Sequence, residues 1–432
     1  MKQLVILAGG KGTRIKRYFN VPKLLLKVYG KPLLYWHIRL AEKYHFKKIL
    51  LITGYKSDFI ENYLKKFKTH IKIEIFKEDI LEGTGGALLK SYDYLDKNFI
   101  LTYGDVLSNI NLNNFYKYHL KKKADVTVFT HPNDHPESSD IVIKEKNDSI
   151  VKILKYPHNR KFYPNLAISA SFCINRNFLN KEKFYKNKKT DFIKDILSKN
   201  LDHKIFSYQS IDFIKDCGQK KRLEKINKNL NILFQIKNFT NKKSCIFLDM
   251  DGTIVHEIGH LNHYKKLKFY SNISNSIRKI NESNFLCVLV TNKPVIARGE
   301  CSLQMLNKIF CNLEKYLSLS SGYLDKIYFC PHHPEKGFKK EISNLKISCN
   351  CRKPKKGLII KAKNEMNINL SNSWMIGDTT TDIKLGKSTG MKTILLNTGF
   401  KGEDNKFKVK PDYNFNNFNS AINYILRKHD YK

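Results

Sequence analysis

Residues 245–253 read Cys-Ile-Phe-Leu-Asp-Met-Asp-Gly-Thr, an apolar strand that ends in two carboxylates. Asp249 and Asp251 are two positions apart, and a strand places such residues on the same side. Both carboxylates therefore leave the carboxyl edge of a sheet together, where open α/β folds bind ligands. An aspartate can attack phosphorus to form an aspartyl phosphate, and the crowded negative charge requires a divalent cation, usually Mg²⁺. The stretch predicts phosphoryl transfer; for these residues alone, the alternative is an acidic turn after a buried strand.

Three later segments contribute polar side chains to the same predicted edge. Two of them are apolar strands, at 285–292 and 373–376, and the third is the loop Cys-Arg-Lys-Pro that begins at residue 351. The polar side chains, in chain order, are Thr291, Asn292, Lys353, Asp378 and Asp382. A hydroxyl and an ammonium group can hold phosphoryl oxygens, and carboxylates add oxygen ligands for the cation. In this order, the residues resemble the haloacid dehalogenase (HAD) superfamily of phosphatases.

The resemblance implies a role for each of these residues. Asp249 is then the nucleophile and Asp251 the general acid and base. Thr291 and Lys353 bind the phosphoryl group. The implied Mg²⁺ ligands are Asp249, the backbone carbonyl of Asp251, and Asp378, with Asp382 in support. The resemblance also implies a HAD-like three-layer α/β fold.

A cluster of cysteine and histidine residues lies between the second strand and the third. Cys330-Pro-His-His precedes Cys349-Asn-Cys. A Cys-x-His pair and a Cys-x-Cys pair can together close a tetrahedral zinc site, whereas a disulfide is disfavoured in a cytosolic chain. The expected ligands of a structural Zn²⁺ are Cys330, His332, Cys349 and Cys351, with His333 as the substitute. The alternative is a set of unrelated cysteines on a basic loop.

The string Thr-Asn-Lys-Pro-Val-Ile-Ala-Arg-Gly at 291–299 narrows the resemblance. Together with Cys-Arg-Lys-Pro it resembles the branch of D-glycero-D-manno-heptose-1,7-bisphosphate phosphatases and histidinol phosphatases. This implies that Asn292, Arg298 and Arg352 bind the phosphate or hydroxyl groups of the substrate. The usual Asn-Gln-Ser-Gly reads Asn-Lys-Pro-Val here, so the fine specificity stays open.

The amino-terminal half begins with a glycine-rich loop after a short apolar strand at 3–8. Gly-Gly-Lys-Gly-Thr-Arg follows at 9–14, and successive glycine amides can cradle a phosphate, although a plain tight turn gives the same pattern. With the later Pro22-Lys23 and Glu-Gly-Thr-Gly-Gly-Ala at 82–87, it resembles the sugar-1-phosphate nucleotidyltransferases, which implies a Rossmann-like α/β fold. The implied nucleotide-binding residues are Gly9, Gly10, Gly12, Thr13, Arg14, Lys23, Gly83 and Thr84.

Two carboxylates of this half match the Mg²⁺ ligands of the same family. Asp105 ends an apolar strand in Tyr-Gly-Asp, and Asp216 precedes a predicted helix. A sugar phosphate oxygen attacks the nucleotide α-phosphorus, so the site must position two anions and spread their charge. The Glu-Lys-Pro of the family reads Lys155-Tyr-Pro here, which leaves open whether Lys155 contacts the sugar phosphate.

Length and charge set further limits. From 432 residues and two motif sets, we expect a nucleotidyltransferase domain at 1–232, a linker at 233–244 and a phosphatase domain at 245–432. The 78 basic and 39 acidic residues give a net charge of +39, which favours anionic substrates. The lysines are scattered and no nucleic-acid-binding motif accompanies them, so nucleic-acid binding is disfavoured. Because no apolar run reaches about 18 residues, we expect no membrane span and a cytoplasmic location.

These observations predict a bifunctional enzyme of nucleotide-activated heptose biosynthesis. The carboxy-terminal half removes the 7-phosphate of D-glycero-D-manno-heptose 1,7-bisphosphate. The amino-terminal half joins heptose 1-phosphate to a nucleotide, with GTP favoured, and releases pyrophosphate. One alternative joins a histidinol-phosphate or other small-phosphate phosphatase to a hexose- or choline-phosphate nucleotidyltransferase. The other is a basic nucleic-acid-binding protein with degenerate catalytic halves.

Overall fold

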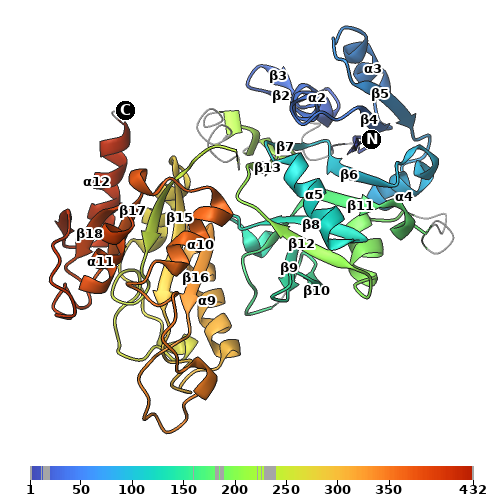
Figure 1. Ribbon diagram of the computed structural model, residues 1–432. Helices are drawn as coiled ribbons and strands as arrows, with labels where there is room; N and C mark the ends of the chain where they lie inside the picture. The colour runs from blue at the N-terminus through green and yellow to red at the C-terminus, as the bar shows by residue number, and fades with distance from the viewer. Residues whose placement is uncertain are drawn as a thin grey trace. The chain divides into compact units, whose positions relative to one another are not determined.

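The computed structural model divides the chain into two compact units (Figure 1). It describes residues 2–10, 12, 20–158, 160–180, 184, 189–220, 222–224, 226–227 and 240–430. Unit 1 comprises Met1–His131, Ser139–Tyr156 and Leu166–Asn238, and unit 2 comprises Pro132–Ser138, Pro157–Asn165 and Phe239–Lys432. Both units combine strands with helices, which confirms the predicted α/β class. No helix within the described ranges is long and apolar enough to cross a membrane.

A nine-stranded mixed sheet forms the centre of the described part of unit 1. Its strands are β1 (Gln3–Leu7), β4 (Lys48–Thr53), β5 (Lys72–Lys77), β6 (Asn98–Tyr103), β8 (Val126–His131), β9 (Ile141–Lys144), β10 (Ile150–Leu154), β11 (Ala167–Asn175) and β12 (Ile205–Gln209). Four neighbours run parallel in the order β6-β1-β4-β5, and β11 runs antiparallel to β6. Two short pairs lie outside this sheet: β2 (Lys27–Val28) with β3 (Lys31–Pro32), and β7 (Val106–Ser108) with β13 (Ile214–Asp216).

Helices cover both faces of this sheet. They are α2 (Leu33–Lys43), α3 (Ser57–Lys65), α4 (Gly83–Lys90) and α5 (Leu112–Lys122). Successive residues of β1 point to opposite faces, so Leu4 shares one hydrophobic core with Ile38 of α2. Val5 shares the other core with Leu88 of α4. Burial on both faces explains why the central strands are near-continuous apolar runs.

A parallel six-stranded sheet forms the centre of the described part of unit 2. Its strands are β14 (Ser244–Leu248), β15 (Phe285–Asn292), β16 (Lys326–Cys330), β17 (Trp374–Gly377), β18 (Lys392–Leu396) and β19 (Tyr413–Phe415). They lie in the order β16-β15-β14-β17-β18-β19, and each neighbouring pair is parallel. The strand predicted at 285–292 matches β15, and the one predicted at 373–376 begins one residue later as β17. Because β14 lies between β15 and β17, the carboxyl ends of these three strands meet.

Unit 2 has three layers. Its helices are α8 (Ile273–Asn281), α9 (Leu303–Ser318), α10 (Gly357–Met366), α11 (Thr380–Ser388) and α12 (Phe418–Asp430). Ile246 and Leu248 of β14 pack in one core with residues of α8, α9 and α12. The alternate residues Cys245 and Phe247 are also buried, and α10 and α11 contact the sheet at β16 and at β17 and β18. This arrangement confirms the predicted three-layer fold.

Candidate active sites

An acidic cluster lies at the carboxyl ends of β14 and β17 in unit 2. Asp249 directly follows β14, Asp378 directly follows β17, and Asp382 lies in the first turn of α11. All three side chains are buried. One carboxylate oxygen of each lies within 4.8 Å of those of the other two. The structure thus brings together three carboxylates that are far apart in the sequence.

Lys353 lies inside this cluster. Its Nζ is 2.7 Å from Asp249 Oδ1 and 2.7 Å from Asp382 Oδ1. Burial alone would lower the pKa of Lys353, but the two carboxylates raise it above its ordinary value. Asn292 fixes the loop, because its Oδ1 accepts from the Lys353 N–H at 3.0 Å and its Nδ2 donates to the Lys353 carbonyl at 3.2 Å. That Asn292 also contacts substrate stays a prediction.

The charge of the cluster is incompletely balanced, since three carboxylates face one ammonium group. Burial, together with the charges of Asp249 and Asp382, raises the pKa of Asp378 to about 8. Burial also raises the pKa of Asp382 to about 6, although the charge of Lys353 acts in the opposite direction. A hard divalent cation prefers oxygen ligands of this kind. The residues present therefore fit Mg²⁺.

The Asp-Gly-Thr turn after β14 makes room for Asp378. Gly252 has φ 75°, and a Cβ atom there would lie 2.1 Å from Asp378 Oδ2. A Cβ atom at Gly399 would also lie 2.1 Å from the same oxygen, which accepts a hydrogen bond from the Phe400 N–H at 2.8 Å. The backbone at Gly252 and Gly399, where no side chain intervenes, therefore encloses the Asp378 carboxylate.

Asp251 has a partner that the sequence did not reveal. Lys293 Nζ forms an ion pair with Asp251 Oδ2, and Lys293 is 2 % exposed. The sequence does mark Lys293 as unusual, because Asn-Lys-Pro-Val stands where the family has Asn-Gln-Ser-Gly. This departure did not indicate that Lys293 pairs with Asp251. On the same strand end, Thr291 is buried, and within the described ranges its Oγ1 has no hydrogen-bond partner. An unpaired hydroxyl at this edge is suited to a phosphoryl oxygen.

A pocket of about 450 Å³ adjoins these residues. Its lining includes Asp249, Asp251, Thr291, Lys353, Arg298 and Arg352. Arg298 donates to His260 Nε2 at 2.9 Å and to His333 Nε2 at 3.3 Å. Arg352 Nη1 donates to the His332 carbonyl at 3.3 Å. The predicted catalytic and substrate-binding residues therefore share one pocket, with cations on its wall.

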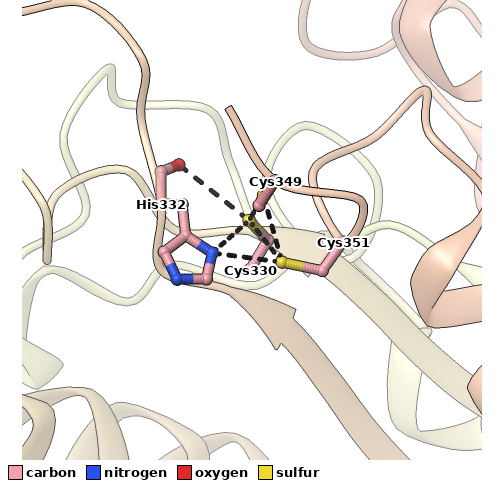
Figure 2. A group of neighbouring side chains, drawn as sticks. All are labelled: Cys330, His332, Cys349 and Cys351. Atoms are coloured by element: carbon pink, nitrogen blue, oxygen red, sulfur yellow. Dashed lines mark hydrogen bonds between the residues drawn. The ribbon is translucent and has the colours of Figure 1, made fainter. Parts of the chain in front are cut away.

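Beside this pocket, the predicted zinc ligands form a compact group (Figure 2). Cys330 ends β16, and the other three residues lie on loops. Cys351 Sγ is 3.2 Å from each of Cys330 Sγ, Cys349 Sγ and His332 Nδ1. A tetrahedral site with metal–sulfur bonds of about 2.3 Å has edges of about 3.8 Å, about 0.6 Å longer than these separations. The group fits a tetrahedral thiophilic metal, and His333 contacts Arg298 instead.

The two predicted metal ligands of unit 1 also lie together. Asp105 lies two residues beyond the end of β6, after Gly104, and Asp216 ends β13. A Cβ atom on Gly218 would lie 2.9 Å from Asp216 Oδ1 and 3.1 Å from Asp105 Oδ2, so both carboxylates border one point. Lys23 Nζ is 2.6 Å from Asp105 Oδ2, and Arg222 Nη1 is 2.6 Å from Asp216 Oδ2. Oxygen ligands with two cations nearby suit a metal-bound triphosphate.

Another pocket, in unit 1, is lined by five of the eight predicted nucleotide-binding residues. Its lining includes Gly9, Gly10, Lys23, Gly83, Thr84 and Asp105. Gly12 lies close to Lys23, since a Cβ atom there would be 3.1 Å from Lys23 Cγ. Lys155 is exposed on the segment after β10 and does not line this pocket. Thr13 and Arg14, also predicted to bind the nucleotide, lie outside the described residues.

The two folds and their sites define a chain that joins a nucleotidyltransferase to a phosphatase. A family model described as nucleotidyl transferase matches residues 3–231, and one described as HAD-hydrolase-like matches residues 350–421. The chain therefore belongs to the nucleotidyl transferase family through its first half and to the heptose-1,7-bisphosphate phosphatases through its second. Both predicted resemblances are confirmed.

Two relatives and one solved structure illustrate these similarities. D-glycero-beta-D-manno-heptose-1,7-bisphosphate 7-phosphatase of Yersinia pestis is 35% identical over 165 residues, which is 37% of this chain and 84% of that protein. Its namesake in Haemophilus influenzae is 36% identical over 156 residues, 36% of this chain and 82% of that protein. The crystal structure of HddC from Yersinia pseudotuberculosis complexed with GMP-PN aligns with 53% of this chain and 100% of that chain, at 23% identity and a TM-score of 0.47.

Proposed function

We propose that the chain is a bifunctional enzyme of nucleotide-activated heptose biosynthesis. Unit 2 removes the 7-phosphate of D-glycero-D-manno-heptose 1,7-bisphosphate, and unit 1 joins the resulting heptose 1-phosphate to a nucleoside triphosphate and releases pyrophosphate. The observation that carries the proposal is the fusion of the two families in one chain, because the product of the first reaction is the substrate of the second. GTP is the first nucleotide to test. The proposal places both reactions in the cytoplasm.

In the phosphatase reaction, Asp249 is the nucleophile. Its Oδ1 accepts hydrogen bonds from the Met250 N–H at 2.7 Å and from Lys353, so we assign the attack on phosphorus to Oδ2. The bond from phosphorus to the C7 oxygen breaks as the new bond forms, and Asp251 gives that oxygen a proton. Asp251 then takes a proton from the water that hydrolyses the aspartyl phosphate. Inorganic phosphate leaves, Asp249 is again a carboxylate, and Asp251 again carries the proton that it donated.

Charge on the transferred group is balanced by groups already in place. Lys353 and the hydroxyl of Thr291 hold phosphoryl oxygens, while Arg298 and Arg352 bind the rest of the substrate. Asp249, Asp378 and the Asp251 carbonyl would hold Mg²⁺, which when bound would neutralise the carboxylates and the phosphoryl group. Lys293 positions Asp251 through their ion pair.

The transferase reaction needs no covalent intermediate. A phosphate oxygen of the sugar attacks the nucleotide α-phosphorus, and the bond to the bridging oxygen of the departing pyrophosphate breaks. Lys23 supplies positive charge at the phosphates, and Asp105 and Asp216 would hold Mg²⁺, which would spread the charge of the triphosphate when bound. The amides that follow β1 complete the anion site.

We also propose a structural Zn²⁺ on Cys330, His332, Cys349 and Cys351. The four ligand atoms lie close enough for one tetrahedral metal. Because Lys353 is two residues beyond Cys351, the metal would fix the loop that carries the phosphoryl-binding cation. Metal analysis of the purified protein tests this: one zinc per chain is expected, and a full set of alkylatable, zinc-free cysteines in active enzyme contradicts it.

Incubating the purified protein with the heptose bisphosphate, Mg²⁺ and each of four nucleoside triphosphates tests the whole proposal. We expect phosphate and pyrophosphate in equal amounts and a nucleotide-heptose detectable by mass spectrometry. Two variants serve as controls: Asp105→Asn should block only nucleotide transfer, and Asp249→Asn should block phosphate release but still form nucleotide-heptose when heptose 1-phosphate is supplied. Phosphate release without any nucleotide-heptose contradicts the transferase part. Faster hydrolysis of histidinol phosphate than of the bisphosphate favours the alternative substrate class.

A further inference from the structure

An aromatic ring lies against Arg298, one of the predicted substrate-binding residues of unit 2. Phe338 is on the loop at 333–348, which joins the two pairs of predicted zinc ligands. The guanidinium carbon of Arg298 lies over this ring, 4.7 Å from its centroid. Arg298 lines the pocket of about 450 Å³, whereas Phe338 is half-buried and does not line it. Phe338 therefore contacts a pocket residue from outside the pocket, and none of the predicted roles uses it.

The backbone of this loop is fastened to the segment that carries Arg298. The Ile342 N–H donates to the Ala297 carbonyl at 2.9 Å. Gly299 has φ 72°, and a Cβ atom there would overlap the Lys340 carbonyl oxygen. The two backbones are therefore in direct contact on both sides of Arg298, and the loop cannot move away from the guanidinium without breaking this contact.

The ring itself is held by neighbouring charges. Glu341 Oε2 accepts from the Phe338 N–H at 3.2 Å and lies 3.6 Å from Lys346 Nζ. Lys346 Nζ is 4.4 Å from the centroid of the Phe338 ring. An aromatic face attracts a cation within about 6 Å, so the ring attracts both the Lys346 ammonium group and the Arg298 guanidinium.

The guanidinium of Arg298 is fixed but not fully used by the protein. Nη1 donates to His260 Nε2 and Nη2 donates to His333 Nε2. Arg298 Nε is buried, and within the described ranges it has no hydrogen-bond partner. A buried donor without an acceptor is costly, and a substrate oxygen could remove that cost. The contacts of Arg298 thus hold a donor group in place at the pocket.

We propose that Phe338 is a positioning residue, which holds Arg298 for binding the part of the substrate that lies away from the reacting phosphate. The inference rests on the proposed phosphatase function of unit 2. A planar guanidinium matches phosphate oxygens only in a defined orientation. The ring limits its movement on one side, and the two imidazoles hold its edges. Loss of the ring therefore weakens substrate binding and leaves the chemistry at Asp249 unchanged.

Product inhibition of the full chain, assayed without nucleotide, separates the two parts of the pocket. Inorganic phosphate occupies the reacting position, whereas heptose 1-phosphate retains the remote part of the substrate. Phe338→Leu keeps apolar bulk and removes the aromatic face, so the KM of the bisphosphate and the inhibition constant of heptose 1-phosphate should each rise roughly 2- to 30-fold. The kcat and the inhibition constant of inorganic phosphate should change by less than about twofold. Phe338→Tyr keeps the face and should stay close to the parent chain.

Tyr413→Leu is the matched control. Tyr413 also has a cation over its ring, since Lys428 Nζ is 4.8 Å from the centroid. It lies on β19 and does not line the pocket, so this variant should keep all four constants. Melting curves show whether each variant is folded, and Phe338→Met replaces Phe338→Leu if the latter is not.

Several outcomes separate this inference from the proposed function. An unchanged KM in Phe338→Leu, or a loss confined to kcat, overturns the inference even if the heptose bisphosphate is the best substrate. An equal rise in both inhibition constants also overturns it, because the ring would then support the whole pocket. The parent chain could instead prefer histidinol phosphate. If Phe338→Leu then raises the KM of histidinol phosphate but not that of p-nitrophenyl phosphate, which has no remote polar group for Arg298, the inference stands and the proposed function fails.

Discussion

Asp378→Asn tests the charge balance of the acidic cluster in unit 2. Burial and the charges of Asp249 and Asp382 raise the pKa of Asp378 to about 8 in the folded protein, whereas an unfolded chain gives an aspartate a pKa of about 3.9. Between these values, the metal-free folded state holds a proton that the unfolded state has lost. The stabilisation by this proton is present at low pH and is lost as the pH rises through about 8.

Linkage sets the size of this effect. One proton bound only by the folded state changes the free energy of unfolding by about 1.4 kcal/mol per pH unit. We therefore expect the metal-free stability of unit 2 to fall by roughly 2 kcal/mol between about pH 6 and about pH 8 on account of Asp378. Asp382, with a pKa of about 6, adds a slope of the same sign at lower pH. The Asp378→Asn variant should lose the change in the free energy of unfolding that Asp378 causes between about pH 6 and about pH 8.

Mg²⁺ should have the opposite effect on the pH dependence of stability, because it should stabilise unit 2 more as the pH rises. It binds the ionised carboxylates and displaces the proton from Asp378, so its affinity for the parent chain should rise as the pH rises toward about 8. At a concentration about 100 times its dissociation constant it adds about 2.7 kcal/mol to the stability. Asp378→Asn should respond much less, because a neutral amide offers one oxygen without charge.

Urea unfolding followed by tryptophan fluorescence measures both effects. The chain has two tryptophans, and Trp374 is buried in β17 of unit 2. A Trp36→Phe background therefore leaves one reporter of this unit. Asp412→Asn is the control: although burial acts in the opposite direction, Lys387 and Thr393 lower the pKa of Asp412, so this variant should keep the Mg²⁺ response. Stability that is flat between about pH 6 and about pH 8, or equal stabilisation of Asp378→Asn by Mg²⁺, would refute the reasoning.

Three further substitutions test the separate parts of the chain. Asp249→Asn should reduce phosphate release by at least about 1000-fold and leave pyrophosphate release from heptose 1-phosphate intact; loss of both would mean that the two units are not independent. Lys293→Gln should lower the phosphatase kcat by about 100-fold with a smaller change in KM, because Asp251 loses the cation that positions it for proton transfer; an unchanged kcat would make the ion pair dispensable. Cys349→Ser should lose the proposed zinc and lower the melting temperature of unit 2, as measured by metal analysis and calorimetry, and a variant that keeps one zinc would exclude Cys349 as a ligand.

Residues whose place depends on strand periodicity were predictable from the sequence. Asp249 and Asp251 leave the end of β14 together, Asp378 follows β17, and the parallel order of the strands brings their ends to one edge. The zinc-type group was predictable for a related reason, because its short spacings restrict where the ligand atoms can lie. In each case a local rule, combined with a fold class that local patterns also indicate, is enough to bring the side chains together.

Lys293 and Glu78 obey no such rule. Each is a charged residue beside polar neighbours in the sequence, as in Lys-Glu-Asp at 77–79, and such patterns ordinarily predict solvent exposure. Their burial depends on distant partners: Lys293 on Asp251 at the end of β14, and Glu78 on the bare backbone of Gly9 at the end of β1. The sequence predicts that Gly9 belongs to a phosphate-binding loop. In the structure, the absence of a side chain at Gly9 also leaves space for the Glu78 carboxylate.

Gly252 performs the same task for Asp378 in unit 2. In both units, a glycine after a central parallel strand removes a side chain that would clash with a carboxylate. A buried carboxylate is stable only when hydrogen-bond donors or cations surround it. A bound ligand can supply these groups where the protein does not. The surroundings differ between the two sites: Asp378 lies beside the carboxylates of Asp249 and Asp382, whereas Glu78 lies in a pocket with apolar lining and near the charges of Lys90 and Glu82. A glycine after a parallel strand therefore makes room for a buried carboxylate, and the charges around that carboxylate set the kind of ligand that would stabilise it.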